Sequence, residues 1–105
     1  MTSWYNYSMN KTIMSTIARA KLTPFQKAVY RAVARIPTGK TMTYAQVARA
    51  IGRPRAVRAV GTALNRNPFA PQVPCHRVVR SDGTIGGFAS GAHKKRVLLR
   101  KEGAL

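Results

Sequence analysis

Apolar side chains recur every three or four residues in three parts of the chain, which is the spacing of one face of an α-helix. The first part opens at Thr23, a capping residue that is followed by Pro24 at the first helical position and by Gln26 three residues on. Pro37 and Gly39 are expected to end this helix. Its apolar stripe consists of Phe25, Val29, Ala32, Val33 and Ile36.

Two shorter helices are predicted next. One opens at Thr43-Tyr44-Ala45-Gln46, with Gly52 as its C-terminal cap, and its apolar face consists of Val47, Ala48 and Ile51. The other opens at Pro54 and runs to about Arg66. Its inward face consists of Val57, Val60, Gly61 and Leu64, and its outer face carries Arg55, Arg58 and Arg66.

Two short helices joined by a tight glycine-containing turn, the second of them basic, predict a helix-turn-helix. Many helical hairpins carry arginine on their solvent face, so a structural role without DNA stays open for this pair. Residues 67–74 contain three prolines, which predicts a stiff, irregular connection after the second helix.

The remaining segments complete the fold prediction. Residues 75–79 and 84–85 are β-prone and flank Ser81-Asp82-Gly83, which predicts a hairpin. Residues 86–91 are expected to form a flexible loop, and residues 93–102 a closing helix that buries Val97, Leu98 and Leu99. The predicted fold is mainly α, a winged helix-turn-helix-like domain with a short β-hairpin near the single cysteine.

Charge narrows the class of function. The 105 residues include 19 Lys or Arg and two carboxylates, Asp82 and Glu102, which gives a net charge of +17. Such an excess predicts a polyanionic partner, most simply nucleic acid. Two distant carboxylates argue against a glycosidase-type acid pair, and one Cys with two His cannot fill a four-ligand protein zinc site. The apolar runs are too short to span a membrane, and a single cysteine predicts a reducing, intracellular setting.

Residues 1–21 differ from the rest of the chain. They are polar and aromatic, without acids and without the apolar core of a secretory signal. We expect a loosely packed extension, weakly ordered or accessory, ahead of a domain at residues 22–105. A targeting peptide stays open as the alternative.

Cys75 is the candidate nucleophile. A free cysteine often serves only as a small buried apolar residue, and that interpretation stays open. A thiol with an ordinary pKa near 8.5 is mostly protonated at neutral pH, so a nucleophilic thiol needs a base or a positive field. His76 follows directly and can act as the base, while surrounding arginines favour the thiolate.

The segment Pro74-Cys75-His76-Arg77-Val78-Val79 resembles the active-site motif of the O6-alkylguanine-DNA alkyltransferases. The resemblance extends from about residue 22 to residue 105. Four more segments match that family in order and spacing: Thr43-Tyr44, Arg58-Ala59-Val60-Gly61, Asn67-Pro68 and Glu102-Gly103. As a set these motifs are highly specific.

The resemblance implies a role for each matching residue. It makes Cys75 the alkyl acceptor, His76 the base that acts on it through water, and Glu102 the carboxylate that orients His76. It makes Tyr44 the residue that crowds the target's 3′ phosphate and assists proton transfer, and Asn67 the support of the turn before the cysteine. These five are the expected catalytic residues.

The resemblance also implies base flipping from the minor groove, because a thiol cannot reach the alkyl group inside the duplex. Arg58 corresponds to the finger that enters the base stack. The expected DNA-binding residues are Arg58, Tyr44, Arg55, Arg66, Ala59 and Gly61. The expected pocket around the flipped base consists of Pro74, Phe88, Ala89 and Val78, the last through its carbonyl.

The implied function is repair of O6-alkylguanine in double-stranded DNA by irreversible transfer to Cys75, without cofactor or metal. We expect a monomer in the cytoplasm and nucleoid, or in the nucleus of a eukaryote, with cooperative binding along DNA left open. Family members usually carry a further N-terminal domain, and often have Tyr and Ser where this chain has Phe88 and Ala89. Shorter alkyltransferase-like relatives with Trp at the acceptor position bind the lesion without reacting. A non-catalytic lesion-binding module, or a plain DNA-binding regulator, therefore stays open.

Overall fold

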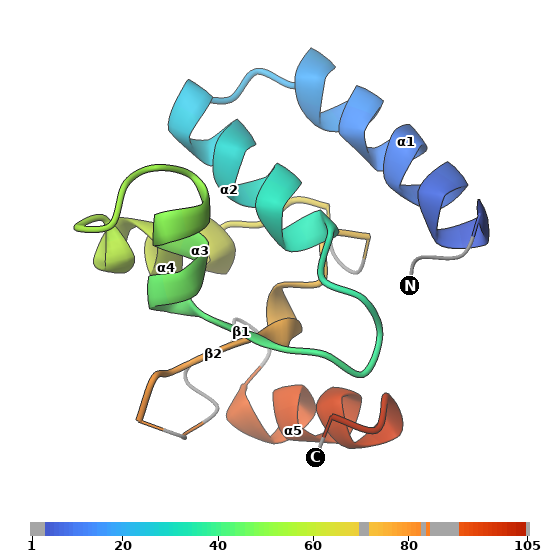
Figure 1. The fold of residues 1–105 in the computed structure, drawn as a ribbon, viewed down its shortest axis with the longest axis vertical. Helices are drawn as coiled ribbons and strands as arrows, with labels where there is room; N and C mark the ends of the chain where they lie inside the picture. The colour runs from blue at the N-terminus through green and yellow to red at the C-terminus, as the bar shows by residue number, and fades with distance from the viewer. Residues whose placement is uncertain (1–3, 70–71, 83, 85–90, 105) are drawn as a thin grey trace.

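The computed structural model describes residues 4–69, 72–82, 84 and 91–104 and has five α-helices in these residues (Figure 1). Two short strands and one 3-10 turn connect the helices. In chain order the elements are α1 (Trp4–Arg19), α2 (Pro24–Ala34), β1 (Met42–Thr43), α3 (Tyr44–Ala50), α4 (Val57–Asn65), the 3-10 turn η1 (Cys75–Arg77), β2 (Val78–Val79) and α5 (Ala92–Lys101). The mainly helical fold predicted from the sequence is confirmed.

The core lies where α2, α3 and α4 meet. Many of its fully buried side chains come from the apolar stripes of these helices, as Val33, Val47 and Val60 illustrate. Tyr30 of α2 is also buried, and its hydroxyl donates to the Ala63 carbonyl of α4 at 2.6 Å. The stripe residues pack because each helix of a small domain is stable only when its apolar face is covered.

The predicted starts of α2 and α3 are confirmed by complete capping boxes. The Thr23 hydroxyl accepts from the Gln26 amide, and the Gln26 side chain accepts from the Thr23 amide. Thr43 and Gln46 repeat the arrangement at α3. Gly52, with φ +74°, ends α3 as predicted, because its left-handed backbone lets its own amide donate to the Arg49 carbonyl and the Arg53 amide to the Ala48 carbonyl.

The predicted start of α4 was wrong by three residues. Pro54 lies in a turn in which the Ala56 amide donates to the Arg53 carbonyl, and the helix begins at Val57. Val57 is 37% exposed rather than buried, because this first turn projects beyond the residues that cover Val60 and Leu64. The helix-turn-helix arrangement of α3 and α4 remains.

The strand pairing differs from the predicted hairpin. Val78–Val79 pairs in parallel with Met42–Thr43, and residues 75–77 form a 3-10 turn instead of extending the strand. After β2, the Arg80 amide donates to the Thr84 carbonyl, and the Asp82 carboxylate accepts from Thr84. Gly83 and Ile85 of the predicted hairpin lie outside the described residues, so the wing stays a prediction.

The closing helix is present as α5, but its buried face was misplaced. Leu99 is fully buried, Leu98 is half-buried, and Val97 is 39% exposed. Lys95 is fully buried instead. Residues four apart share a helix face, so Lys95 accompanies Leu99 inward while Val97 points away.

The chain before residue 22 contains a helix that the apolar pattern did not predict. In Figure 1, α1 lies alongside α2, and Ile13 and Ile17 of α1 belong to the buried core. These two side chains are therefore not loosely packed, and the Lys27 ammonium ties the helices by donating to the Ala18 carbonyl at 2.9 Å. The division into an extension at residues 1–21 and a domain at 22–105 stays a prediction. Among the described residues, the helices are either too short or too polar to cross a bilayer.

Candidate functional site

Cys75 is the first residue of η1 and is half-buried. The proline-rich segment that leads to it is held by Asn67, whose amide nitrogen donates to the Val73 carbonyl at 2.8 Å and whose amide oxygen accepts from the Phe69 backbone at 2.9 Å. The Cys75 amide in turn donates to the Val73 carbonyl. These bonds fix where the thiol stands without using the thiol itself.

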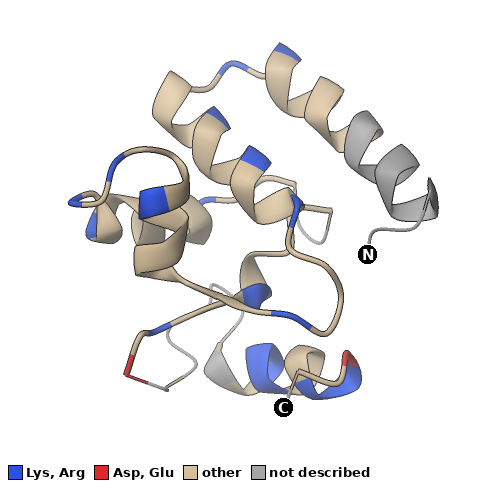
Figure 2. Ribbon diagram, in the orientation of Figure 1, with Lys and Arg blue, Asp and Glu red and all other residues tan. Residues whose placement is uncertain are grey.

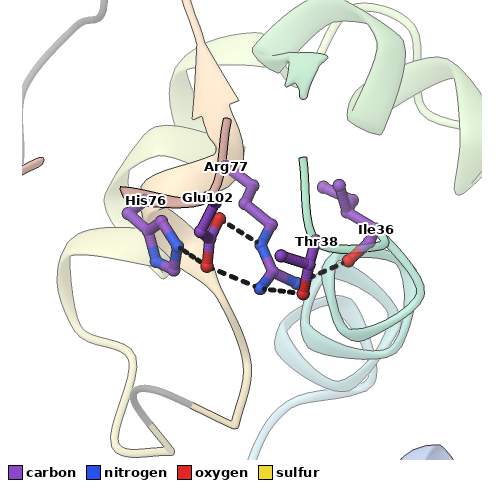
Figure 3. A network of polar contacts seen from close by, with 5 residues as sticks. All are labelled: Ile36, Thr38, His76, Arg77 and Glu102. Carbon is purple, nitrogen blue, oxygen red and sulfur yellow. Dashed lines mark hydrogen bonds and ion pairs between the residues drawn. The ribbon is translucent and has the colours of Figure 1, made fainter. Parts of the chain in front are cut away.

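His76, the next residue, is buried and faces Glu102 (Figure 3). Its Nε2 atom lies 3.0 Å from Oε2 of Glu102. An ionised carboxylate can only accept, so Nε2 carries the proton in this contact. In the described part of the chain no hydrogen bond joins His76 to the Cys75 thiol, although the 3-10 turn places the two residues side by side.

The other ring nitrogen of His76, Nδ1, belongs to a side chain that is only 6% exposed. Nδ1 makes no hydrogen bond to the described residues. Every fully enclosed polar side-chain atom in those residues does have a hydrogen-bond partner. Nδ1 is therefore not fully enclosed. A neutral imidazole with Nε2 protonated has Nδ1 free to accept a proton, which is the state that a general base requires.

Arg77 completes the cluster, and the sequence analysis assigned it no role. Its Nε and Nη2 atoms donate to the two oxygens of Glu102 at 2.9 and 2.7 Å. Its Nη1 atom donates to the Ile36 carbonyl at 2.7 Å, and Nη2 also donates to the Thr38 hydroxyl at 3.1 Å. The position of Arg77 within the cysteine motif was the available signal, but spacing alone does not show that residues 36, 77 and 102 meet.

The Arg77 hydrogen bonds hold the pKa of the Glu102 carboxyl below its ordinary value. Partial burial of the carboxyl opposes this shift, and the contact with His76 adds to it to a smaller extent. Glu102 is therefore ionised across the neutral pH range. A permanent negative charge at Oε2 favours the Nε2-protonated form of His76 and stabilises the imidazolium that forms when Nδ1 takes up a proton.

Lys95 is the second residue that the sequence analysis missed. Its ammonium donates to the Val78 carbonyl at 2.6 Å and to the Tyr44 hydroxyl at 3.4 Å, and it lies 5.6 Å from the centre of the Tyr44 ring. Burial lowers the pKa of Lys95 to about 8. Its place four residues before Leu99 was the signal in the sequence, because residues four apart share one face of a helix.

Four of the six residues predicted to contact DNA, namely Tyr44, Arg55, Arg58 and Gly61, line an open depression of about 940 Å³. Its lining comes from Tyr44 of α3, from residues of α4, and from Arg80, the residue after β2. Burial raises the pKa of the half-buried Tyr44 hydroxyl. The lining residues that matter here are Tyr44, Arg55, Arg58, Gly61, Asn65 and Arg80.

The other predicted site residues that the structure describes do not line this depression. Ala59 and Arg66 are exposed on and just after α4, while Pro74 and Val78 are buried on either side of η1. Phe88 and Ala89 of the predicted base pocket lie outside the described residues. Figure 2 shows Lys and Arg spread over the helices and loops rather than gathered in a tail. The described residues contain no cluster of three His, Cys, Asp or Glu that could hold a metal ion.

The chain is similar to known DNA-repair proteins. Residues 24–104 match the family model described as 6-O-methylguanine DNA methyltransferase, DNA binding domain. A methylated-DNA–protein-cysteine methyltransferase from Methanosarcina barkeri is 55% identical over 80 residues, which are 76% of this chain and 51% of that protein. The chain thus spans about half the length of this curated relative.

Two solved structures share the fold. The structure of Mycobacterium tuberculosis OGT in complex with DNA has a TM-score of 0.77 and 44% identity, over 80% of this chain and 52% of that one. S. pombe Atl1 in complex with damaged DNA containing O6-carboxymethylguanine has a TM-score of 0.71 and 37% identity, over 80% of each chain.

Proposed function

The chain belongs to the family of the 6-O-methylguanine DNA methyltransferase DNA-binding domain, and from this premise we propose that it repairs O6-alkylguanine in DNA by transfer to Cys75. The thiol sulfur forms a bond to the alkyl carbon while the bond from that carbon to guanine O6 breaks. The bonding electrons stay with guanine, which takes up a proton, and the thiol proton leaves through water to His76. The thioether is stable, so each molecule reacts once.

The observation that carries this proposal is the place of Cys75 directly before a histidine that a carboxylate holds. His76 bonds Glu102 through Nε2, and its Nδ1 makes no hydrogen bond to the described residues. A thiol becomes a strong nucleophile only as the thiolate, so an acceptor must take up its proton. The Glu102 charge stabilises the imidazolium that results.

DNA is proposed to bind over α4 and the adjoining depression. Arg55 and Arg58 are exposed there, and small residues such as Ala59 and Gly61 let the helix approach a groove closely. Arg58 is proposed to enter the stack where the damaged nucleotide leaves it. A planar guanidinium recovers part of the stacking lost on flipping, which costs a few kcal/mol.

The flipped base is proposed to enter beside Tyr44, Pro74 and the Val78 carbonyl. A carbonyl oxygen has two lone pairs, so Val78 can accept from Lys95 and from an exocyclic amine of guanine at once. Phe88 and Ala89 are proposed to complete the pocket. The protein acts as a monomer on double-stranded DNA in this proposal.

Intact mass after incubation with duplex DNA containing O6-methylguanine tests the transfer. We expect one added methyl group, located on Cys75 by peptide mapping, and none on the Cys75→Ser variant, which should still bind the lesion. Undamaged duplex of the same sequence is the matched control. An unmodified parent protein under excess lesion would overturn the proposal.

A non-catalytic lesion-binding role is the second candidate, because the chain is 37% identical in sequence and similar in fold to S. pombe Atl1, whose structure holds damaged DNA containing O6-carboxymethylguanine. The cysteine at position 75 favours the enzyme. The same mass experiment decides between them if binding to damaged and undamaged duplex is measured alongside it. Tight, lesion-selective binding without any mass change would favour the second candidate.

A further inference from the structure

Arg77 makes four hydrogen bonds that link three parts of the chain (Figure 3). We propose that Arg77 is the positioning residue of the transfer reaction and fixes Glu102 in the orientation in which Oε2 meets His76. The inference rests on the proposed function, since it assigns a residue to the same reaction. Among the described residues Arg77 makes no hydrogen bond to the thiol and does not line the DNA-facing depression, so it acts through Glu102.

The geometry requires such a residue because Glu102 is poorly held by its own helix. It is the C-cap of α5, one residue beyond the last helical position, where the helix dipole disfavours a carboxylate. Exposed Arg100 and Lys101 precede it and offer competing positive charges on the solvent side. A single bond to His76 would let the carboxylate group rotate about its last torsion.

The Arg77 fork removes this freedom. Two parallel bonds from one planar guanidinium fix both carboxylate oxygens, which a lysine cannot do. Oε2 receives Nη2 of Arg77 at 2.7 Å and faces Nε2 of His76 at 3.0 Å, so the two contacts share one oxygen. The orientation of the imidazole is therefore set by Arg77 through a single carboxylate.

Arg77 is itself anchored at the end of α2. The Ile36 carbonyl and the Thr38 hydroxyl hold its far side. The same turn passes close to the Glu102 backbone, because a Cβ at Gly39 would lie 3.2 Å from the Glu102 carbonyl oxygen. Gly39 also has φ +86°, which disfavours any side chain. The turn at residues 36–39 thus reaches the Glu102 side chain through Arg77 and leaves room for the Glu102 backbone at Gly39.

The test measures single-turnover transfer from free O6-benzylguanine, which needs no base flipping, together with DNA affinity and thermal stability. Arg77→Met keeps the aliphatic stem and removes the fork. We expect transfer to slow by about 10- to 100-fold, the usual effect of removing a residue that orients a reacting group, with DNA affinity within about twofold of the parent. The transfer rate of Arg77→Lys should lie between those of the parent and Arg77→Met. Arg100→Met removes an exposed cation in the same region and should transfer at the parental rate.

A double-mutant cycle separates positioning from a general structural role. In the Glu102→Gln background, Arg77→Met should slow transfer by less than about threefold more, because the residue through which it acts is already altered. An equal factor in both backgrounds would overturn the proposal. So would transfer at the parental rate by folded Arg77→Met.

Nitrogen NMR of the His76 ring provides a readout that needs no transfer. The parent should show one fixed tautomer with Nε2 protonated, and Arg77→Lys should show a mixture even where Arg77→Met is too unstable to study. An unchanged tautomer in Arg77→Lys, with the transfer rate of the parent, would overturn the proposal. A parent that shows the fixed tautomer but never becomes alkylated would instead refute the proposed function alone.

Discussion

Arg58 on α4 and Arg77 in η1 carry the same guanidinium group in opposite surroundings. Arg58 is exposed, borders the open depression and has no ion-pair partner among the described residues. Arg77 is largely covered, and all three of its nitrogens bond the protein. An exposed guanidinium is available to an external anion, whereas a fully engaged one can only hold its neighbours in place.

This contrast divides the site into two parts with separate tasks. The surface of α4 with Tyr44 is proposed to receive DNA, and the cluster of His76, Arg77 and Glu102 is proposed to handle the proton. Changes in the first part should affect binding and flipping, while changes in the second should affect transfer from any substrate. Variants of each part can test that division, and the largest effect is expected at Glu102.

Glu102→Gln should slow transfer from duplex O6-methylguanine and from free O6-benzylguanine by a similar factor, about 10- to 100-fold. The amide keeps the shape but loses the charge that stabilises the His76 imidazolium. Single-turnover rates on both substrates measure the effect. A loss confined to the duplex substrate would place Glu102 in the DNA-binding part and break the division.

Arg58→Ala should slow transfer from duplex DNA about tenfold more than transfer from the free base, which needs no flipping. The ratio of the two rates is the informative quantity, since the free base can be a slow substrate even for the parent. Arg19→Ala, an exposed arginine on α1, is the matched control and should leave the ratio unchanged. Equal losses on both substrates would make Arg58 a structural residue.

Binding to undamaged duplex should weaken steeply with salt, because each phosphate neutralised contributes about 0.9 to the slope of log K against log salt concentration. Arg55→Ala should lower that slope by about 1, whereas Arg77→Met should leave it unchanged. Fluorescence anisotropy at several salt concentrations measures both slopes. An equal reduction by the two variants would contradict the separate surroundings of these arginines.

Lys95 predicts a smaller effect on stability. Burial lowers its pKa to about 8, whereas an unfolded chain has a lysine pKa of about 10.4. Between these values the unfolded chain binds more protons than the folded chain, so this group makes the free energy of unfolding rise with pH. Chemical denaturation at several pH values from about 8 to about 9.5 measures it.

The Lys95 effect is isolated by subtraction. The free energy of unfolding of the parent minus that of Lys95→Met should become more positive as pH rises across that window. Lys94→Met changes an exposed neighbour on the same helix and should give a constant difference. A constant difference for Lys95→Met as well would show that burial does not perturb this lysine.

The parts of the fold that are coded locally could be predicted from the sequence. The starts of α2 and α3 depend on capping residues three positions apart, and the end of α3 depends on Gly52. The start of α4 was misplaced because proline is equally at home in a turn and at a first helical position. Local signals of this kind do not rank the two.

The contacts between distant segments could not be predicted in the same way. Strand β2 pairs with β1 across more than thirty residues, and neither two-residue strand has a pattern that names its partner. Lys95 and Arg77 look like ordinary surface cations in a chain with 19 of them. Their burial depends on which groups the fold brings opposite them, here the Val78 carbonyl and Glu102.

Thr43 belongs to two elements at once, since it pairs with Val79 in the two-stranded sheet and caps α3. On the other strand Val78, which precedes Val79 and pairs with Met42, directly follows η1. The spacing between the helix-turn-helix and Cys75 is therefore set by backbone pairing over four residues and not by side-chain fit. Inserting a single residue between Thr43 and Tyr44 would therefore separate the strand pairing from the start of α3 and shift the helix-turn-helix relative to Cys75.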